Sequence, residues 1–504
     1  MLDSTRVHPL NLNEIADINR LDANKKLDDK LRGQLGQFMS TSSVSKLLAE
    51  MFEDLDGEHR LLDAGAGVGS LTAAFIERVK PYAKSIDSTC FEISKVMNHY
   101  LLDTLNNCSN VCQQHDIKFK QQIFEEDFIE HSVNALLHDE FVPRFNKVII
   151  NPPYLKIAVK SRERQLLKLI GYETGNLYSA FVGLAIKLLE KDGELVAITP
   201  RSFCNGPYFS DFRKLILDTC SLNKIHVFDS RKSAFKTDNV LQENVVFHLT
   251  KGEPQRQSVI VTSGACSEDP NPQVLEVPFK EVVNSNNSDR FIHVITSENE
   301  RKIAILAGGL PCSLADLGIQ VSTGKVVDFR TRENLRTNFV EGTVPLIYPQ
   351  HLQKCGIHWP LVNAKKPNAL INSESTANLM VPNGTYVLTR RLTAKEEQRR
   401  IVASLYTADF ANVEVVAFEN KTNYFHAFGC PLSDDLAKGL WVFLNSSLVD
   451  KYFRQMNGHT QVNATDLRTL KYPSKVDLVL MGEMIDFEEF NQGRVDEIIE
   501  NVIN

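Results

Sequence analysis

The sequence predicts an α/β domain with a mostly parallel sheet, followed by a second domain of mixed α+β structure. Two observations predict the first domain. Short apolar runs alternate with amphipathic segments up to about residue 250, and a glycine-rich turn joins one such run to the next helix. After residue 251 the pattern changes to short mixed strands and helices. At 504 residues and 43% hydrophobic composition, the chain can bury two packed cores.

Composition limits the function classes that remain open. No apolar run reaches the roughly 20 residues of a membrane span, and residues 1–6 lack a signal-peptide core, so a cytoplasmic protein is expected. The nine cysteines form no Cys-x-x-Cys pair and no histidine pair completes a zinc site, so reduced thiols and no metal are expected. The formal charge of −7 means that any nucleic-acid contact must come from a local basic face.

A helical arm is expected over residues 1–35, where leucines at positions 27, 31 and 35 recur at four-residue spacing. Next come Gly36-Gln37-Phe38 and a Ser/Thr cluster that can cap an amphipathic helix over residues 44–52. A turn entering a helix N-terminus can face an anionic group such as a carboxylate. A plain helix cap is the alternative interpretation.

The glycine turn follows an apolar run at residues 61–62 and opens a helix over residues 71–79. Its pattern is Asp63-x-Gly65-x-Gly67-x-Gly69, and glycines in this context let the backbone approach a nucleotide-like ligand. The leading carboxylate disfavours phosphate and suits a cationic amino-acid group. The spacing also differs from Gly-x-Gly-x-x-Gly, which binds the pyrophosphate of a dinucleotide.

Two further strand ends carry acidic residues. Glu92 lies about one βα unit downstream of the glycine turn, where a carboxylate can accept hydrogen bonds from ribose hydroxyls. Asp127 could accept from an adenine amino group, and Phe128 could stack on the ring. An ordinary structural role is the alternative for each residue alone.

The apolar run at residues 145–150 ends in Asn151-Pro152-Pro153-Tyr154. Proline fixes φ and directs the preceding residue towards an extended conformation, so Asn151 can be held at a strand end. The Asn151 side-chain oxygen and the Pro152 carbonyl then offer two acceptors to a planar NH2 group, with the Tyr154 ring beside them. A simple Pro-Pro turn is the alternative, but ligands of open α/β sheets bind where all four motifs lie, at the carboxyl ends of strands.

The remaining apolar segments complete both domains. Helices are expected over residues 177–189 and 209–216, a buried strand over 194–198, and an antiparallel edge hairpin from 225–228 and 244–247. Phe235 lies in the hairpin loop, either packed back on the fold or forming the wall of a site. Loop-like composition predicts a linker over residues 251–290.

Residues 291–504 form the predicted second domain. Three stretches there are rich in groups that contact nucleic acid, because Arg and Lys can bind guanine, and Asn or Gln adenine, in the major groove. Solvated surface is the alternative for each. The stretches run from Ser322 to Arg332, from Arg390 to Arg400 and from Gly458 to Asn463.

Taken in order, these motifs resemble the gamma class of N6-adenine DNA methyltransferases. The resemblance covers roughly residues 30–250, and the C-terminal part is similar to target-recognition regions of restriction-modification methylases of the PstI and BsuBI type, which implies the target CTGCAG. Met39-Ser40-Thr41 departs from the more usual Phe-Thr-Pro of the family. The implied fold is a Rossmann-like methyltransferase domain over residues 36–250 with a target-recognition domain over 291–504.

The resemblance also implies roles for individual residues. Methyl transfer from S-adenosylmethionine to adenine N6 would involve Asn151, Pro152, Tyr154 and Phe235. The cofactor-binding residues implied by the family motifs are Gln37, Phe38, Thr41, Asp63, Gly65, Gly67, Glu92, Asp127 and Phe128. The implied partner is double-stranded DNA, from which the adenine is flipped out. A functional pairing with a restriction endonuclease is implied as well, and a monomer is expected.

Two other functions remain open at this stage. Glutamine-N5 methyltransferases acting on release factors share Asn-Pro-Pro-Tyr, because an amide NH2 poses the same binding problem, but they lack about 200 extra C-terminal residues of this kind. A DNA-specificity subunit with a degenerate methylase domain is harder to reconcile with the intact series from Asp63 to Tyr154.

Overall fold

The computed structural model describes residues 10–27, 39–138, 144–228, 243–264, 269, 271–283, 290–353, 356–363, 365–394, 397–457, 460–486 and 490–503. The chain divides into two compact units, Met1–Ser297 and Glu298–Asn504, each with its own hydrophobic core. In the described part of the chain, no helix combines the length and apolar content that crossing a bilayer requires.

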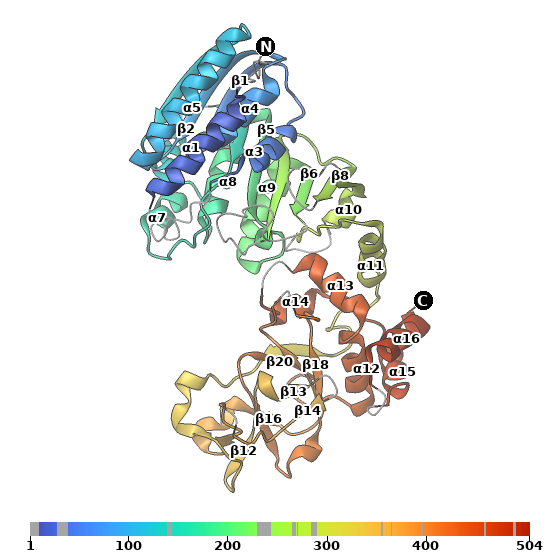
Figure 1. The fold of residues 1–504 in the computed structure, drawn as a ribbon. Helices are drawn as coiled ribbons and strands as arrows, with labels where there is room; N and C mark the ends of the chain where they lie inside the picture. The colour runs from blue at the N-terminus through green and yellow to red at the C-terminus, as the bar shows by residue number, and fades with distance from the viewer. Residues whose placement is uncertain are drawn as a thin grey trace, which may run out of the picture. The chain divides into compact units, whose positions relative to one another are not determined.

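A nine-stranded sheet forms the centre of the first unit (Figure 1). Its strand order is β3-β2-β1-β4-β5-β7-β6-β8-β9. Strands β1 to β5 pair in parallel, whereas β7 runs antiparallel to both β5 and β6. The predicted α/β class with a mostly parallel sheet is confirmed, as is the antiparallel hairpin of β6 and β7. The strands are β1 (Gly57–Ala64), β2 (Ala83–Phe91), β3 (Lys118–Phe124), β4 (Phe145–Ile150), β5 (Leu189–Pro200), β6 (Cys220–Phe228), β7 (Asn244–Lys251), β8 (Ser258–Gly264) and β9 (Gln273–Pro278).

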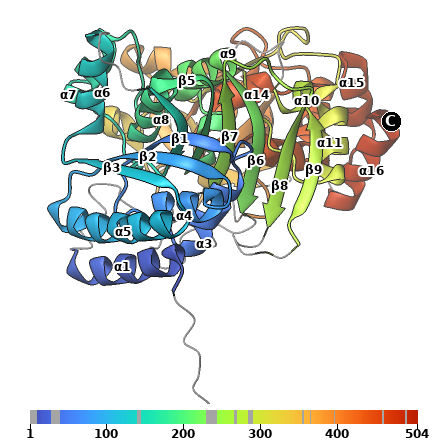
Figure 2. The same cartoon turned by 90° about the horizontal axis from the view of Figure 1, so that it is seen from above.

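Helices cover both faces of this sheet. Figure 2 shows α1, α4 and α5 on one face and α8 and α9 on the other. The helices are α1 (Leu12–Lys26), α3 (Ser42–Glu50), α4 (Ser70–Val79), α5 (Lys95–Gln114), α6 (Phe128–Leu137), α7 (Arg162–Leu169), α8 (Leu177–Leu188), α9 (Ser210–Thr219) and α10 (Phe279–Val282), with 3-10 turns η1 (Arg201–Cys204) and η2 (Pro207–Phe209).

The N-terminal helix lies earlier in the chain than the leucine spacing predicts. A capping box between Asn11 and Glu14 starts α1, which packs on α4 and α5 through Leu12 and Ala16. Leu27 is its C-cap, and residues 28–38 lie outside the described part of the chain. Gln37 and Phe38 are therefore not described.

Part of the predicted linker over residues 251–290 belongs to the sheet. β8 pairs in parallel with β6, and β9 pairs antiparallel with β8. Residues 264–272, whose Gly, Pro and Asn content suggested a linker, connect these two strands. Such a composition is equally compatible with a hairpin loop and with a linker between domains. The sheet therefore extends two strands beyond the predicted hairpin.

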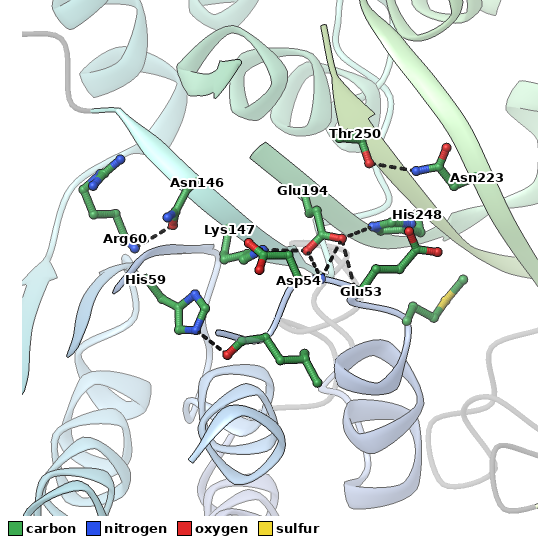
Figure 3. Close-up of polar contacts among 12 residues, drawn as sticks. Glu53, Asp54, His59, Arg60, Asn146, Lys147, Glu194, Asn223, His248 and Thr250 are labelled. Atoms are coloured by element: carbon green, nitrogen blue, oxygen red, sulfur yellow. Dashed lines mark hydrogen bonds and ion pairs between the residues drawn. The ribbon is translucent and has the colours of Figure 1, made fainter. Parts of the chain in front are cut away.

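A buried charge cluster ties three strands of this sheet together (Figure 3). The Glu194 carboxylate on β5 accepts from Lys147 Nζ on β4 at 2.6 Å and lies 3.0 Å from His248 Nε2 on β7. The same carboxylate accepts backbone N–H bonds from Glu53 and Asp54, in the segment before β1. Glu53, Glu194 and His248 could also place ligand atoms around a metal ion. The ammonium of Lys147 supplies a positive charge to Glu194, so the contacts of this cluster form an ion network.

The second unit combines short sheets with C-terminal helices, as the predicted mixed α+β structure requires. Its four-stranded sheet consists of β10 (Gln320–Thr323), β20 (Thr422–His426), β17 (Tyr386–Arg390) and β18 (Ala403–Tyr406). Its five-stranded sheet consists of β11 (Leu335–Arg336), β15 (Ala369–Ile371), β12 (Thr343–Ile347), β19 (Val415–Phe418) and β16 (Met380–Pro382), and β13 (Leu352–Gln353) pairs with β14 (Gly356–Ile357).

The helices of the second unit gather mainly at its C-terminal end. They build a core around the fully buried Trp441 with the strands of the four-stranded sheet. They are α11 (Glu298–Gly308), α12 (Asp434–Leu444), α13 (Ser447–Met456), α14 (Ala464–Thr469), α15 (Lys475–Glu483) and α16 (Gln492–Ile503), with 3-10 turns η3 (Asp328–Arg330), η4 (Arg332–Asn334), η5 (Pro349–His351), η6 (Glu374–Leu379) and η7 (Ala408–Phe410).

Candidate active site

A pocket of about 250 Å³ lies at the carboxyl ends of β1, β2 and β4. Strand order places β1 between β2 and β4, at the point where successive connections leave the sheet in opposite directions, and such crevices bind ligands in open α/β folds. Several predicted site residues meet here. The lining includes Gly65, Gly67, Glu92, Asp127, Phe128, Asn151 and Pro152.

The glycine turn forms one wall of the pocket. Its glycines adopt backbone conformations that residues with a side chain disfavour. Gly65, Gly67 and Gly69 have φ of 78°, 59° and 84°. A Cβ at Gly69 would lie 2.9 Å from Leu101 Cδ1 of α5, so this glycine is also required for helix packing. The backbone N–H groups of Gly65 and Ala66 donate to the Phe91 carbonyl at 2.9 Å, which fixes the turn to the end of β2.

Glu92 connects the end of β2 to the glycine turn. Its carboxylate accepts from the backbone N–H of Gly67 at 2.9 Å and from that of Ser94 at 2.8 Å. Burial raises the pKa of this carboxyl, and the two backbone hydrogen bonds oppose that rise. Each carboxylate oxygen has a second lone pair, so Glu92 can still accept from a ligand hydroxyl in the pocket.

Asp63 lies outside the lining of the pocket, contrary to the simplest interpretation of its motif. The side chain is fully buried at the end of β1, and its Oδ2 accepts from Thr72 Oγ1 at 2.8 Å. Its Oδ1 has no hydrogen-bond partner in the described part of the chain. Burial raises the pKa of Asp63 to about 7, although the Thr72 hydrogen bond opposes the shift.

Asp127 and Phe128 form the wall at the end of β3. Asp127 is the N-cap of α6 and accepts from the Glu130 backbone N–H at 2.9 Å. Phe128 is buried between Phe91 and Phe181, with ring centroids 5.1 Å from each. The pocket therefore has an aromatic side next to an exposed carboxylate.

The Asn-Pro-Pro-Tyr motif forms the opposite wall through its first residues. Asn151 Nδ2 donates to Ser40 Oγ at 3.1 Å, which directs the amide oxygen the other way. The Tyr154 hydroxyl lies 3.0 Å from Asn151 Oδ1 and 3.3 Å from the Ile198 carbonyl. Burial raises the pKa of Tyr154, so this hydroxyl stays protonated and acts as a donor.

Other predicted residues are not brought into the lining. The Tyr154 ring packs edge-on against Tyr178, with centroids 6.3 Å apart and planes at 86°. Thr41 is the N-cap of α3, accepting from the Val44 backbone N–H, so the plain helix-cap interpretation describes this side chain. Phe235 lies outside the described residues.

Comparison with known proteins identifies the family. A model of the Eco57I restriction-modification methylase family matches residues 47–235. The type II methyltransferase M.PstI of Providencia stuartii is 63% identical over 500 residues, which are 99% of each chain. The chain belongs to the type II methyltransferases of restriction-modification systems. M.BsuBI of Bacillus subtilis, another type II methyltransferase, is 43% identical and covers 97% of this chain and 98% of its own.

Among solved structures, the type IIG restriction endonuclease BpuSI is similar to this methyltransferase at a TM-score of 0.46. The two are 14% identical, and the alignment covers 98% of this chain and 66% of the other. The sequence relatives imply S-adenosylmethionine as the methyl donor.

Sequence reasoning missed several residues of this methyltransferase's pocket. Ser40, next to the predicted Thr41, lines the pocket and holds the Asn151 amide. The Ser/Thr cluster could have indicated Ser40. Because Thr41 uses its own side chain to cap the helix, the preceding residue can face the pocket. Glu163, Leu177 and Phe181 also line the pocket, and no local pattern distinguished them from ordinary helix residues.

Proposed function

We propose that this chain transfers a methyl group from S-adenosylmethionine to N6 of an adenine flipped out of duplex DNA, and thereby protects that DNA from a cognate restriction endonuclease. The observation that carries the proposal is the single pocket that brings the glycine turn and Glu92 together with Asn151 and Pro152. One half of this pocket suits a nucleoside-containing cofactor, and the other half suits an amino group.

The residues present fit S-adenosylmethionine. The glycine turn leaves the backbone open to a ligand, and Glu92 is a buried acceptor suited to ribose hydroxyls. The Oδ1 of Asp63 is buried outside the pocket lining and has no hydrogen-bond partner among the described residues, and it is proposed to act on the cationic amino-acid end of the cofactor from behind the turn. When bound, the cofactor supplies a methyl group activated by its sulfonium.

The protein's own part in the chemistry is to hold the amino group of adenine. Asn151 Oδ1, which accepts from the Tyr154 hydroxyl at 3.0 Å, is proposed to accept an N6 proton as well. The Pro152 carbonyl is proposed to accept the other proton. These two bonds stabilise positive charge as it develops on the nitrogen, which is preorganised electrostatic catalysis. No strong base is required.

The partner is proposed to be double-stranded DNA, with CTGCAG as the first target to test. A base inside a duplex is inaccessible, so extrusion costs roughly a few kcal/mol before methyl transfer. Stacking of the base on Tyr154 and Phe235 remains a prediction from the resemblance. A monomer is proposed, because one chain can methylate the two strands of a palindrome in turn.

Labelled S-adenosylmethionine tests the function directly. The purified protein is incubated with a CTGCAG duplex, a duplex of scrambled sequence and a release-factor protein, and the labelled nucleoside or amino acid is identified. We expect N6-methyladenine in DNA. Label at cytosine, or only on a release-factor glutamine, would contradict the proposal, whereas label at adenine in a different sequence would contradict only the target.

Ser40 is expected to act as a positioning residue for Asn151. Ser40→Ala removes the acceptor for Asn151 Nδ2, so the amide is less often oriented with its oxygen towards the substrate. We expect kcat to fall about fivefold, the equivalent of one hydrogen bond of about 1 kcal/mol, with little change in KM for DNA. Ser40→Thr keeps a hydroxyl and should recover most of the rate.

The matched control is Ser221→Ala on β6, which also removes a buried hydroxyl, here one that donates to Asn223 Oδ1 at 2.7 Å. That residue is absent from the pocket lining. Equal losses of kcat in the two alanine variants would show that Ser40 acts through general stability alone.

A further inference from the structure

The charge of the second unit is divided between its strands and its helices. Residues 320–425, which hold all its strands except the last residue of β20, contain thirteen Lys and Arg against nine Asp and Glu. Residues 426–504, which hold α12 to α16, contain seven Lys and Arg against twelve Asp and Glu. A polyanion is therefore attracted to the strand-rich part and repelled by the helices, although the whole chain is acidic.

Parts of the three stretches selected from the sequence meet at one end of the four-stranded sheet. The backbone N–H of Gly324 donates to the Thr422 carbonyl at 2.8 Å, and that of Arg391 donates to the Lys421 carbonyl at 2.9 Å. The backbone N–H of Val462 donates to the Arg391 carbonyl at 2.8 Å. Residues 324–325, 390–392, 420–422 and 460–462 are thus adjacent, and we name the surface formed by their exposed side chains the basic edge.

Buried polar contacts hold the basic edge in place. Asn423 is fully buried; its Nδ2 donates to the Val462 carbonyl at 2.8 Å and its Oδ1 accepts from Thr323 Oγ1 at 3.3 Å. A Cβ at Gly324 would lie 2.2 Å from the Glu419 carbonyl oxygen, so the two backbones pack at the closest approach that glycine permits. Such a scaffold fixes the groups at its surface before a partner arrives, which lowers the entropic cost of binding.

The exposed groups of the basic edge have the chemistry that DNA requires. Lys325, Lys421 and Gln461 are exposed, and Arg390 and Arg391 are half-buried. Lys421 makes no salt bridge with any described residue. Its neighbour Glu419 is buried and accepts from the Lys421 backbone N–H at 2.9 Å, whereas the Lys421 side chain is exposed.

Two arginines of the second stretch do not belong to this surface. Arg399 and Arg400 are buried; Arg400 Nη2 donates to Asn457 Oδ1, and Arg399 donates to the Ser446 carbonyl. They hold the strands to the helices, and the sequence-based expectation for them is corrected. Lys421, by contrast, was in none of the three stretches.

We propose that the basic edge is the surface by which the second unit contacts target DNA, with Lys325 and Lys421 on phosphates and Gln461 on a base edge. This inference rests on the proposed function, since duplex DNA is the polyanion of that reaction. Ammonium groups suit phosphates as point charges, whereas a carboxamide can form paired hydrogen bonds with adenine in the major groove.

Direct binding of wild-type and variant protein to a fluorescent CTGCAG duplex tests the proposal. Lys421→Gln should weaken binding about tenfold at about 0.1 M salt and reduce the slope of log affinity against log salt by about 1, as expected for one lost phosphate contact. Lys475→Gln is the matched control, because Lys475 is exposed at the start of α15 in the acidic helical part. It should leave both quantities unchanged.

Gln461→Ala should reduce the preference for CTGCAG over a duplex with one base pair changed by about tenfold, with an unchanged salt slope. If Lys421→Gln bound the duplex with unchanged affinity, or if Lys475→Gln lost as much affinity, the basic edge would not be the DNA-contacting surface. This outcome is separable from the proposed function because binding is measured without methyl transfer. If the protein methylates DNA but Lys421→Gln does not change binding, only the role of the basic edge is refuted. If binding depends on Lys421 but no DNA is methylated, only the proposed function is refuted.

Discussion

Asn151→Ala is expected to lower the rate of methyl transfer about 100- to 1,000-fold, the loss typical when one preorganised group that stabilises developing charge is removed. The structure gives two reasons. Alanine removes the oxygen that accepts from Tyr154 and is proposed to accept from the adenine amino group, and it releases Ser40 from its contact with the amide. Single-turnover kinetics with saturating cofactor and DNA measure the chemical step.

The binding of both ligands should change little, because the effect is on the transition state rather than on the ground state. Asn146→Ala is the matched control: Asn146 lies on β4, the strand that Asn151 follows, and it is bonded to the Arg60 backbone N–H and the Glu58 carbonyl at 2.7 Å each. It should affect stability without affecting the rate of folded enzyme. An Asn151→Ala rate within a few-fold of wild type would show that the amide does not hold the amino group.

The location of the site followed from the sequence because it depends on one general property of the fold. Parallel strands place their carboxyl ends at the same edge, so motifs that follow successive strands must converge. Gly67, Glu92, Asp127 and Asn151 do line one pocket. The types of these residues were visible in the sequence. Their convergence could be predicted without the order of the strands, because it requires only that the strands run parallel in one sheet.

Predictions that depended on the direction of a single side chain were less secure. Asp63 ends β1 as expected, but its carboxylate turns inward to Thr72. The prediction chose Thr41, whereas Ser40 faces the pocket, a shift of one residue at a helix start. Side-chain direction at such points depends on packing from distant segments, and local spacing does not encode it.

Long-range contacts also explain what the sequence could not show in the second unit. Arg391 and Arg400 belong to the same charged stretch, but Arg391 lies half-buried at a sheet end, whereas Arg400 is buried against Asn457, 57 residues away in the chain. Lys421 gains its place beside Arg391 from the pairing of β17 with β20. Sequence composition alone does not distinguish a basic side chain at the surface from a buried one that joins a strand to a helix.

Glu194→Gln is expected to destabilise the first unit by about 3 kcal/mol at pH 7, because it leaves the buried Lys147 ammonium with only the exposed Asp54 carboxylate, at 2.9 Å, as a counter-charge. Burial raises the pKa of the Glu194 carboxyl, but the His248 hydrogen bond and the Lys147 charge outweigh it and lower the pKa from 4.5 to about 2. A lowered folded-state pKa stabilises the fold above pH 4.5. On the order of 3 kcal/mol is then lost as the pH falls from 4.5 towards 2.

The difference in stability between wild type and Glu194→Gln should therefore be largest at neutral pH and shrink below about pH 4.5. Both tryptophans, Trp359 and Trp441, lie in the second unit, so their fluorescence does not monitor this network. Hydrogen exchange of β4 and β5 amides reports the first unit. The control Glu190→Gln breaks a half-exposed pair with Arg60 and should cost less than about 1 kcal/mol. A pH-independent difference for Glu194→Gln would mean that its effect comes from packing rather than from the charge.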